Sequence, residues 1–130
     1  MIIICGVPNA GKTTYSQQYK DAVHYDSLNM TTRQRYIYLN RLARRGDAVF
    51  DGVFGEGFRR KELVKSCPRG EKKICVWLNT PLEVCLAREN RDRSPEVVLF
   101  HWQAFEPPTM DEGWDRIEVI EWQAEGRAKK

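Results

Sequence analysis

The segment that follows the apolar run Met1 to Cys5 reads Gly6-Val7-Pro8-Asn9-Ala10-Gly11-Lys12-Thr13-Thr14. It matches the pattern G-x-x-x-x-G-K-[ST], in which a strand enters a glycine-rich loop that opens a helix. Glycine lets the backbone of such a loop curl without Cβ clashes, and the free N–H groups at the start of the helix face the loop. The sequence therefore predicts a phosphate-binding loop at the carboxyl end of a buried parallel strand.

This loop predicts a nucleotide site with specific roles for its side chains. Lys12 carries a point charge for the β- and γ-phosphates of ATP, and the Thr13 hydroxyl suits a Mg²⁺ ion that bridges them. A chance match of the pattern is the alternative, but the strand before it and the helical pattern after it argue against chance. The expected nucleotide-binding residues are Gly6, Pro8, Asn9, Ala10, Gly11, Lys12, Thr13 and Thr14.

Length and composition limit the number of domains and the compartment. A chain of 130 residues predicts one domain, over 1–122, followed by a basic tail over 123–130. No apolar run approaches the roughly 20 residues that cross a membrane. The four cysteines form no C-x-x-C pair, and three of them lie in apolar strand or helix patterns. They predict reduced core residues of a cytoplasmic protein rather than disulfides or a metal site.

Strand-like and helix-like segments alternate along the chain. This alternation predicts an α/β protein with the P-loop NTPase fold, a parallel sheet of about five strands with helices on both faces. We expect strands over 2–5, 22–25, 48–51, 73–78 and 116–121, and helices over 11–19, 31–45, 57–66, 82–90 and 94–105. Right-handed crossovers place the phosphate loop at the carboxyl edge of a central strand.

Two carboxylates follow predicted strands at this edge. Asp51 ends an apolar strand and is a candidate Mg²⁺ ligand, directly or through water; the structural alternative is a cap for the turn at Gly52. Asp26 follows the second short strand and is a candidate base for an acceptor hydroxyl. On spacing alone, Asp26 with Ser27 is equally a helix N-cap.

A short, highly charged connection lies between two predicted helices and carries Arg88, Arg91 and Arg93. Arginines on a lid near 88–94 can fold over phosphates and stabilise transition-state charge. A salt-bridged surface turn is the alternative. His24 and His101 have no metal-ligand partners at useful spacing and are given no role.

The chain resembles the kinase domain of polynucleotide 5′-hydroxyl kinases, within the wider group of small P-loop kinases that includes zeta-toxin-like proteins. The resemblance spans almost the whole chain and is carried by the segments 6–13, 23–28, 48–51 and 90–114. The last contains Phe105-Glu106-Pro107-Pro108-Thr109-Met110-Asp111-Glu112-Gly113-Trp114, similar to the block that follows the lid helix in this family. The resemblance implies that Lys12 and Thr13 hold ATP and Mg²⁺ and that Asp26 activates the acceptor. It also implies that Arg91 and Arg93 are lid arginines and that Asp51 lies near the metal.

Departures from the family pattern fall on the acceptor side. Tyr25 and Asn29 stand where the family commonly has arginines, and Asp51-Gly52-Val53 replaces its Asp-x-Asn. The expected acceptor is the 5′-hydroxyl of a nucleic acid, DNA or RNA. The alternatives are a hydroxymethylated base in DNA, a nucleoside or nucleotide, or a sugar nucleotide.

Two other classes of function remain open from the sequence. One is a nucleotide-dependent switch that transfers nothing, although the chain has no N-K-x-D segment of the kind that guanine switches carry. The other is an electrostatic nucleic-acid binder that presents Arg41 to Arg45 and Arg59 to Lys61 on one surface. The sequence makes no prediction of the oligomeric state.

Overall fold

A computed structural model describes residues 1–88 and 93–122 of the chain. Five parallel strands form one sheet in the order β2-β3-β1-β4-β5. The strands are β1 (Ile2–Cys5), β2 (Val23–His24), β3 (Val49–Asp51), β4 (Ile74–Asn79) and β5 (Arg116–Glu121). The helices are α1 (Lys12–Ser16), α2 (Thr32–Ala43), α3 (Gly57–Ser66), α4 (Leu82–Ala87) and α5 (Pro95–Ala104), with 3₁₀ turns η1 (Tyr25–Ser27) and η2 (Met110–Glu112).

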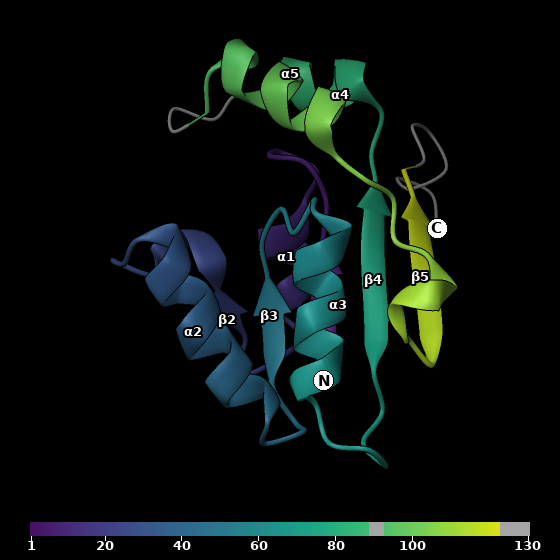
Figure 1. Ribbon diagram of the computed structural model, residues 1–130. Helices are drawn as coiled ribbons and strands as arrows, with labels where there is room; N and C mark the ends of the chain where they lie inside the picture. Colours follow the sequence, from purple (N-terminus) through teal and green to yellow (C-terminus); the bar gives the residue numbers. More distant parts are fainter. Residues whose placement is uncertain (89–92, 123–130) are drawn as a thin grey trace.

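Helices cover both faces of the sheet, as predicted. In Figure 1, α2 and α3 lie in front of the sheet and α1 lies behind it, while α4 and α5 lie above the carboxyl ends of the strands. Neighbouring residues of β1 point to opposite faces of the sheet. Ile3 packs with Leu39 of α2 and Leu63 of α3 on one face. Ile4 packs with Val76 and Val98 on the other. The predicted α/β class, with its parallel sheet, is confirmed.

Local signals explain where several helices begin. Thr31 caps α2 in a capping box with Gln34, and Ser94 caps α5 ahead of Pro95. The Asp26–Ser27 cap considered from the sequence is therefore wrong, because the cap of this helix is Thr31. Segment α1 is shorter than the predicted 11–19, and α4 ends at Ala87 instead of residue 90.

The cysteines and the helices were also compared with the predictions from the sequence. All four cysteines are buried and free, in agreement with the prediction of reduced core residues. Within 1–88 and 93–122, no helix has both the length and the apolar character that crossing a bilayer needs. The predicted tail over 123–130 lies outside the described residues.

Candidate active site

The phosphate loop has a backbone that needs its glycines. Gly11 has φ +104° and Asn9 has φ +69°, both in the left-handed region. A Cβ added at Gly6 would lie 3.0 Å from the carbonyl oxygen of Leu78 and 3.3 Å from the Cβ of Ala10. The loop therefore packs so closely on β4 that only glycine fits at position 6.

The residues that follow β4 and α4, together with the backbone of α4, brace this loop. Thr80 Oγ1 donates to the carbonyl of Ala10 at 2.8 Å, and Asn9 Nδ2 donates to the carbonyl of Cys85 at 3.1 Å. Arg88 Nη1 donates to the carbonyl of Asn9 at 2.7 Å. Arg88, predicted as a lid arginine, thus lies against the loop. Thr80 was not among the predicted site residues, because nothing local in the sequence indicates that it reaches a carbonyl 70 positions away.

Lys12 is a cation in a poorly solvated position. Its Nζ donates to the carbonyl of Val7 at 2.8 Å. Burial lowers the pKa of Lys12 to about 8, although the nearby carboxylates of Asp26 and Asp51 act in the opposite direction. Such a lysine is suited to an anionic ligand, because phosphate oxygens would compensate the charge that the protein leaves underpaired.

This burial predicts that Lys12 destabilises the free protein. The ordinary pKa of 10.5 falls to about 8 on folding, so the unfolded chain binds more protons between these values and stability rises with pH across this window. We expect Lys12→Met to unfold with a free energy about 1 kcal/mol higher than the wild type at pH 7. The advantage should shrink from pH 8 to pH 10. Urea unfolding at several pH values measures it; a constant difference would contradict the assignment.

The loop opens onto a polar cavity of about 420 Å³, here called the loop cavity. Its wall includes Asp51, which is 5% exposed, and His24, whose Nδ1 lies 2.7 Å from Asp51 Oδ2. The pair forms because β2 and β3 are in parallel register, with His24 beside Asp51 at the carboxyl ends of both strands. The lining residues are Pro8, Asn9, Gly11, Lys12, Thr13, Thr14, His24, Asp26, Ser27, Asp51, Gly52, Arg88 and Arg93.

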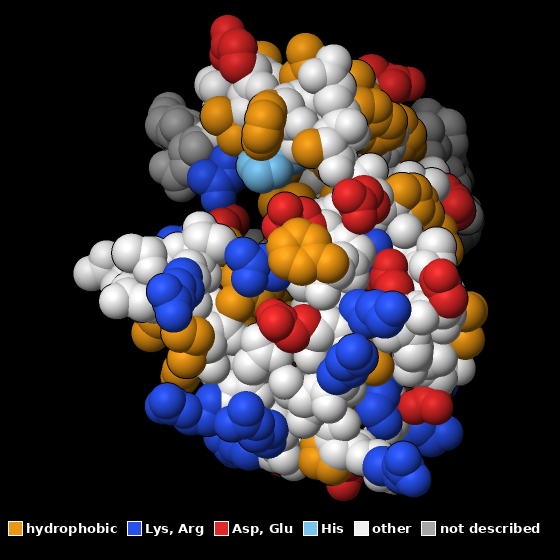
Figure 2. All heavy atoms as spheres, in the orientation of Figure 1, with side chains coloured by type: hydrophobic (Ala, Val, Ile, Leu, Met, Phe, Trp, Pro, Cys, Tyr) orange, Lys and Arg blue, Asp and Glu red, His pale blue; other side chains and the backbone are white. Residues whose placement is uncertain are grey.

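A second cavity of about 420 Å³, the aromatic cavity, lies beside the first under α5. Figure 2 shows the hollow between α5 and the body of the protein. Three residues line both cavities: Pro8, Asp26 and Arg93. Arg93 Nη2 donates to Asp26 Oδ2 at 2.6 Å. The structure therefore brings the predicted base and one predicted lid arginine together where the two cavities meet, whereas Arg91 lies outside the described residues.

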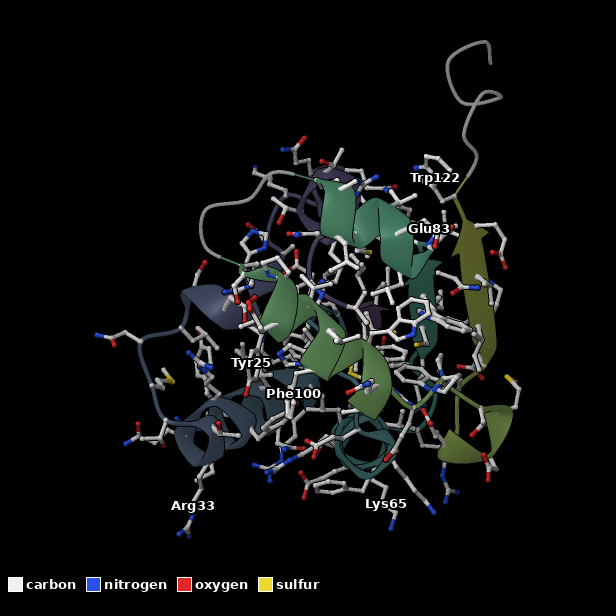
Figure 3. The ribbon with its side chains drawn as sticks, turned by 90° about the horizontal axis from the view of Figure 1, so that it is seen from above. Tyr25, Arg33, Lys65, Glu83, Phe100 and Trp122 are labelled. Atoms are coloured by element: carbon white, nitrogen blue, oxygen red, sulfur yellow. The ribbon has the colours of Figure 1, made fainter. Side chains whose placement is uncertain are left out.

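Rings dominate the wall of the aromatic cavity. Tyr25 lies 5.5 Å from Tyr36 and 5.6 Å from Phe54, measured between ring centroids. Phe100 and His101 line the other side from α5; Figure 3 shows Phe100 next to Tyr25 in the view from above. Burial lowers the pKa of His101, which therefore faces the cavity as a neutral imidazole at pH 7. Neither histidine was predicted to have a role, but His101 lines the aromatic cavity and His24 lines the loop cavity.

The loop that supplies Phe54 is held by a buried ion pair. Phe54 has φ +43°, rare for a residue with a bulky side chain. Arg60 Nη1 donates to its carbonyl at 2.6 Å, and the same guanidinium contacts both oxygens of Glu112 at 2.9 and 2.8 Å. Trp114 Nε1 adds a third bond to Glu112 at 2.8 Å. The Phe105 to Trp114 block thus fixes the shape of the aromatic cavity.

This ion pair shows that one predicted basic surface is wrong. The sequence grouped Arg59, Arg60 and Lys61 on a single exposed face, but Arg60 is 0% exposed. It shares the inner face of α3 with Leu63 and Val64, at the i, i+3 and i+4 spacing of a buried helical stripe. Only Arg59 and Lys61 of that group reach the surface.

A third cavity of about 780 Å³ adjoins the phosphate loop on the side of β5. It shares Gly11, Thr14 and Arg88 with the loop cavity and is also lined by Tyr15, Ile120 and Trp122. Figure 3 shows Trp122 at the end of β5. Among the described residues, no group of three or more His, Cys, Asp or Glu side chains forms a metal-binding cluster.

Comparison with known proteins places the fold. No protein-family model and no curated protein matches this sequence. A gluconokinase from Sinorhizobium meliloti superposes with a TM-score of 0.66 at 14% identity, over 97% of this chain and 85% of that chain. A protein of Chloroflexus aurantiacus that is provisionally named a kinase superposes with a TM-score of 0.62 at 17% identity, over 92% and 83% of the two chains. These likenesses confirm the P-loop fold predicted from the sequence.

Proposed function

We propose that the protein is an ATP-dependent, Mg²⁺-requiring kinase that transfers the γ-phosphoryl group of ATP to a hydroxyl group. One observation carries the proposal: the Asp26–Arg93 pair lies where a polar cavity with a phosphate loop meets an aromatic cavity. A phosphoryl donor and an acceptor in adjacent cavities would meet at a carboxylate and a guanidinium, the groups that phosphoryl transfer requires.

On the donor side, Lys12, Thr13 and Thr14 would bind the phosphates of ATP. The third cavity suits the adenine ring, because Arg88 and Trp122 offer a planar cation and an indole on its wall. Thr13 and Asp51 are the oxygen donors that would hold Mg²⁺. When bound, the ion neutralises charge on the phosphates.

On the acceptor side, Asp26 would act as the general base. The acceptor hydroxyl attacks the γ-phosphorus, its proton passes to a carboxylate oxygen of Asp26, and ADP leaves with the bridging oxygen. Arg93, and Arg88 at the phosphate loop, would stabilise charge on the transferred group. Arg91 remains a predicted lid arginine.

The walls of the aromatic cavity favour an acceptor with a planar ring. We propose a nucleic-acid 5′-hydroxyl first, and a hydroxymethylated base, a nucleoside or nucleotide, or a sugar nucleotide as alternatives. The gluconokinase neighbour suggests a sugar acid, but this cavity fits one less well. Among the described residues on its wall, the only Lys or Arg is Arg93, which is already paired with Asp26.

A panel of acceptors tests the proposal. The protein is incubated with ATP and Mg²⁺ alone, and then with an oligonucleotide, a nucleoside, a hydroxymethylated base in DNA, a sugar nucleotide or gluconate, while ADP release is followed. We expect at least one planar acceptor to stimulate release. Tight ATP binding without stimulation by any acceptor would favour the non-transferring switch instead.

His24 is expected to position Asp51 for the metal. Its ring nitrogen contacts Oδ2, which leaves Oδ1 for a metal or its water. We expect His24→Ala to weaken metal affinity about 10- to 100-fold, as loss of a group that orients a metal ligand does. His24→Asn, which keeps a hydrogen-bond donor, should recover part of it. Mn²⁺ binding in the presence of ADP, followed by electron paramagnetic resonance, gives a readout independent of turnover; equal affinities in the two variants and the wild type would refute the role.

A further inference from the structure

A groove of about 280 Å³ runs between α2 and α3, outside the three cavities described above. Its α2 wall carries Arg33, Ile37, Arg41 and Arg44. Steps of four, four and three residues keep these side chains on one face of a helix, one turn after another. Arg59 faces them from α3. We call this surface the arginine groove.

The arginine groove adjoins the aromatic cavity at Tyr36. Tyr36 lines both, and the Arg59 guanidinium stacks on its ring at 4.3 Å from the centroid. Arg59 Nε is buried and makes no hydrogen bond among the described residues; the carboxylate of Glu56 lies 3.9 Å away. A ligand that extends out of the aromatic cavity past Tyr36 would therefore meet the guanidinium of Arg59, whose side chain is 26% exposed.

Charge in the arginine groove is strongly one-sided. Among the described residues, four arginines line it against a single carboxylate, Glu62, which accepts a hydrogen bond from Asn40 at 3.3 Å. Lys61 and Lys65, which do not line the groove, are exposed elsewhere on α3. Figure 2 shows lysine and arginine side chains gathered over the face formed by α2 and α3, and Figure 3 shows Arg33 and Lys65 pointing outward on this side. This surface would attract a chain of anionic groups.

Exposed apolar side chains accompany the charge. Phe100 of α5, on the wall of the aromatic cavity, is 66% exposed. Phe58 of α3 is 61% exposed and lies beside Arg59, 4.9 Å from its guanidinium. Aromatic faces next to a basic track are the combination that binds single-stranded nucleic acid, because bases stack on the rings while phosphates meet the cations. An acidic peptide would use the charges but not the rings.

We propose that the arginine groove binds the phosphodiester backbone of a single-stranded polynucleotide whose hydroxyl-bearing nucleotide occupies the aromatic cavity. The inference rests on the proposed kinase function and names its acceptor as a chain rather than a free nucleoside. A single strand fits because its bases are unpaired and one of them can enter a cavity walled by rings.

The test compares two double variants that remove equal charge. Arg41→Gln/Arg44→Gln removes two groove arginines, and Lys20→Gln/Arg69→Gln removes two exposed cations elsewhere. Binding of a fluorescent single-stranded oligonucleotide is measured by anisotropy over a salt series, without ATP. We expect the groove variant to lose about 0.7 in the slope of log K against log salt per lost contact, about 1.4 in all. We expect the control to match the wild type.

A second arm measures phosphoryl transfer. The groove variant should show a KM at least about tenfold higher for the oligonucleotide than the wild type, with an unchanged KM for a mononucleoside. Equal losses in the control variant, no oligonucleotide binding by the wild type, or equally tight binding of polyglutamate would each overturn the inference. Oligonucleotide binding that depends on the groove, without transfer to any acceptor, would refute the kinase proposal but support the proposed groove. Transfer to a mononucleoside, together with oligonucleotide binding that does not depend on the groove, would support the kinase proposal and refute the groove.

Discussion

The Glu112→Gln protein is expected to unfold with a free energy about 3–5 kcal/mol lower than the wild type. Glu112 binds the guanidinium of Arg60 through both oxygens, and Arg60 is fully buried. Burial alone would raise the pKa of Glu112, but the hydrogen bonds from Arg60 and Trp114 outweigh it and lower the pKa. The substitution leaves Arg60 charged without its counter-ion. Urea unfolding at pH 7 measures the loss.

The exposed pair Arg116–Glu118 provides the matched control. Its contact of 2.6 Å is as short as the buried one, but the Arg116 and Glu118 side chains are 57% and 34% exposed, so Glu118→Gln should cost less than about 1 kcal/mol. Equal effects of the two substitutions would contradict the account. Because the pKa of Glu112 is lowered on folding, its contribution is present at neutral pH and fades as pH falls below the ordinary value of 4.5. The wild type should therefore lose more stability in acid than Glu112→Gln does.

The Asp26→Asn protein is expected to bind ATP normally and to transfer phosphoryl groups at least about a hundredfold more slowly. An amide keeps the shape of the side chain and can still accept a hydrogen bond from Arg93, but it cannot take the proton of the acceptor hydroxyl. The cap of α2 is Thr31, so this substitution should leave helix stability unchanged. Single-turnover transfer and equilibrium ATP binding separate the two effects.

The exposed carboxylate Asp21 offers the same chemical change away from both cavities. We expect Asp21→Asn to behave as the wild type in both assays. Near-normal turnover of Asp26→Asn would remove Asp26 from the chemistry and leave it only as the ion-pair partner of Arg93.

The fold was largely predictable from local signals. The apolar run before the phosphate loop gave β1, and the Ser94-Pro95 start gave α5 with its cap. The helix predicted from residue 31 begins there, and its cap is Thr31 in a capping box with Gln34, not the Asp26-Ser27 pair that was an alternative cap. The end of α4 could not be predicted, because Arg88 leaves the helical conformation where its guanidinium binds the phosphate loop.

The parts of the site that were predictable are those that lie in one contiguous segment or directly at the end of a strand. The phosphate loop is contiguous, and Asp26 and Asp51 follow strands whose ends share one edge of the sheet. The contacts between His24 and Asp51, and between Arg93 and Asp26, join residues 27 and 67 positions apart. Arg60 looked like a surface charge because its partner Glu112 lies 52 positions away. Such pairs depend on strand register and helix packing, which single-sequence patterns do not specify.

Transfer of label from γ-labelled ATP to an acceptor tests the central claim most directly. The wild type is incubated with Mg²⁺, labelled ATP and a single-stranded oligonucleotide or a nucleoside, and the products are separated. We expect a labelled phosphomonoester on the acceptor hydroxyl, and we expect it to be lost in Asp26→Asn. Label that appears only as inorganic phosphate, with every acceptor unmodified, would contradict it.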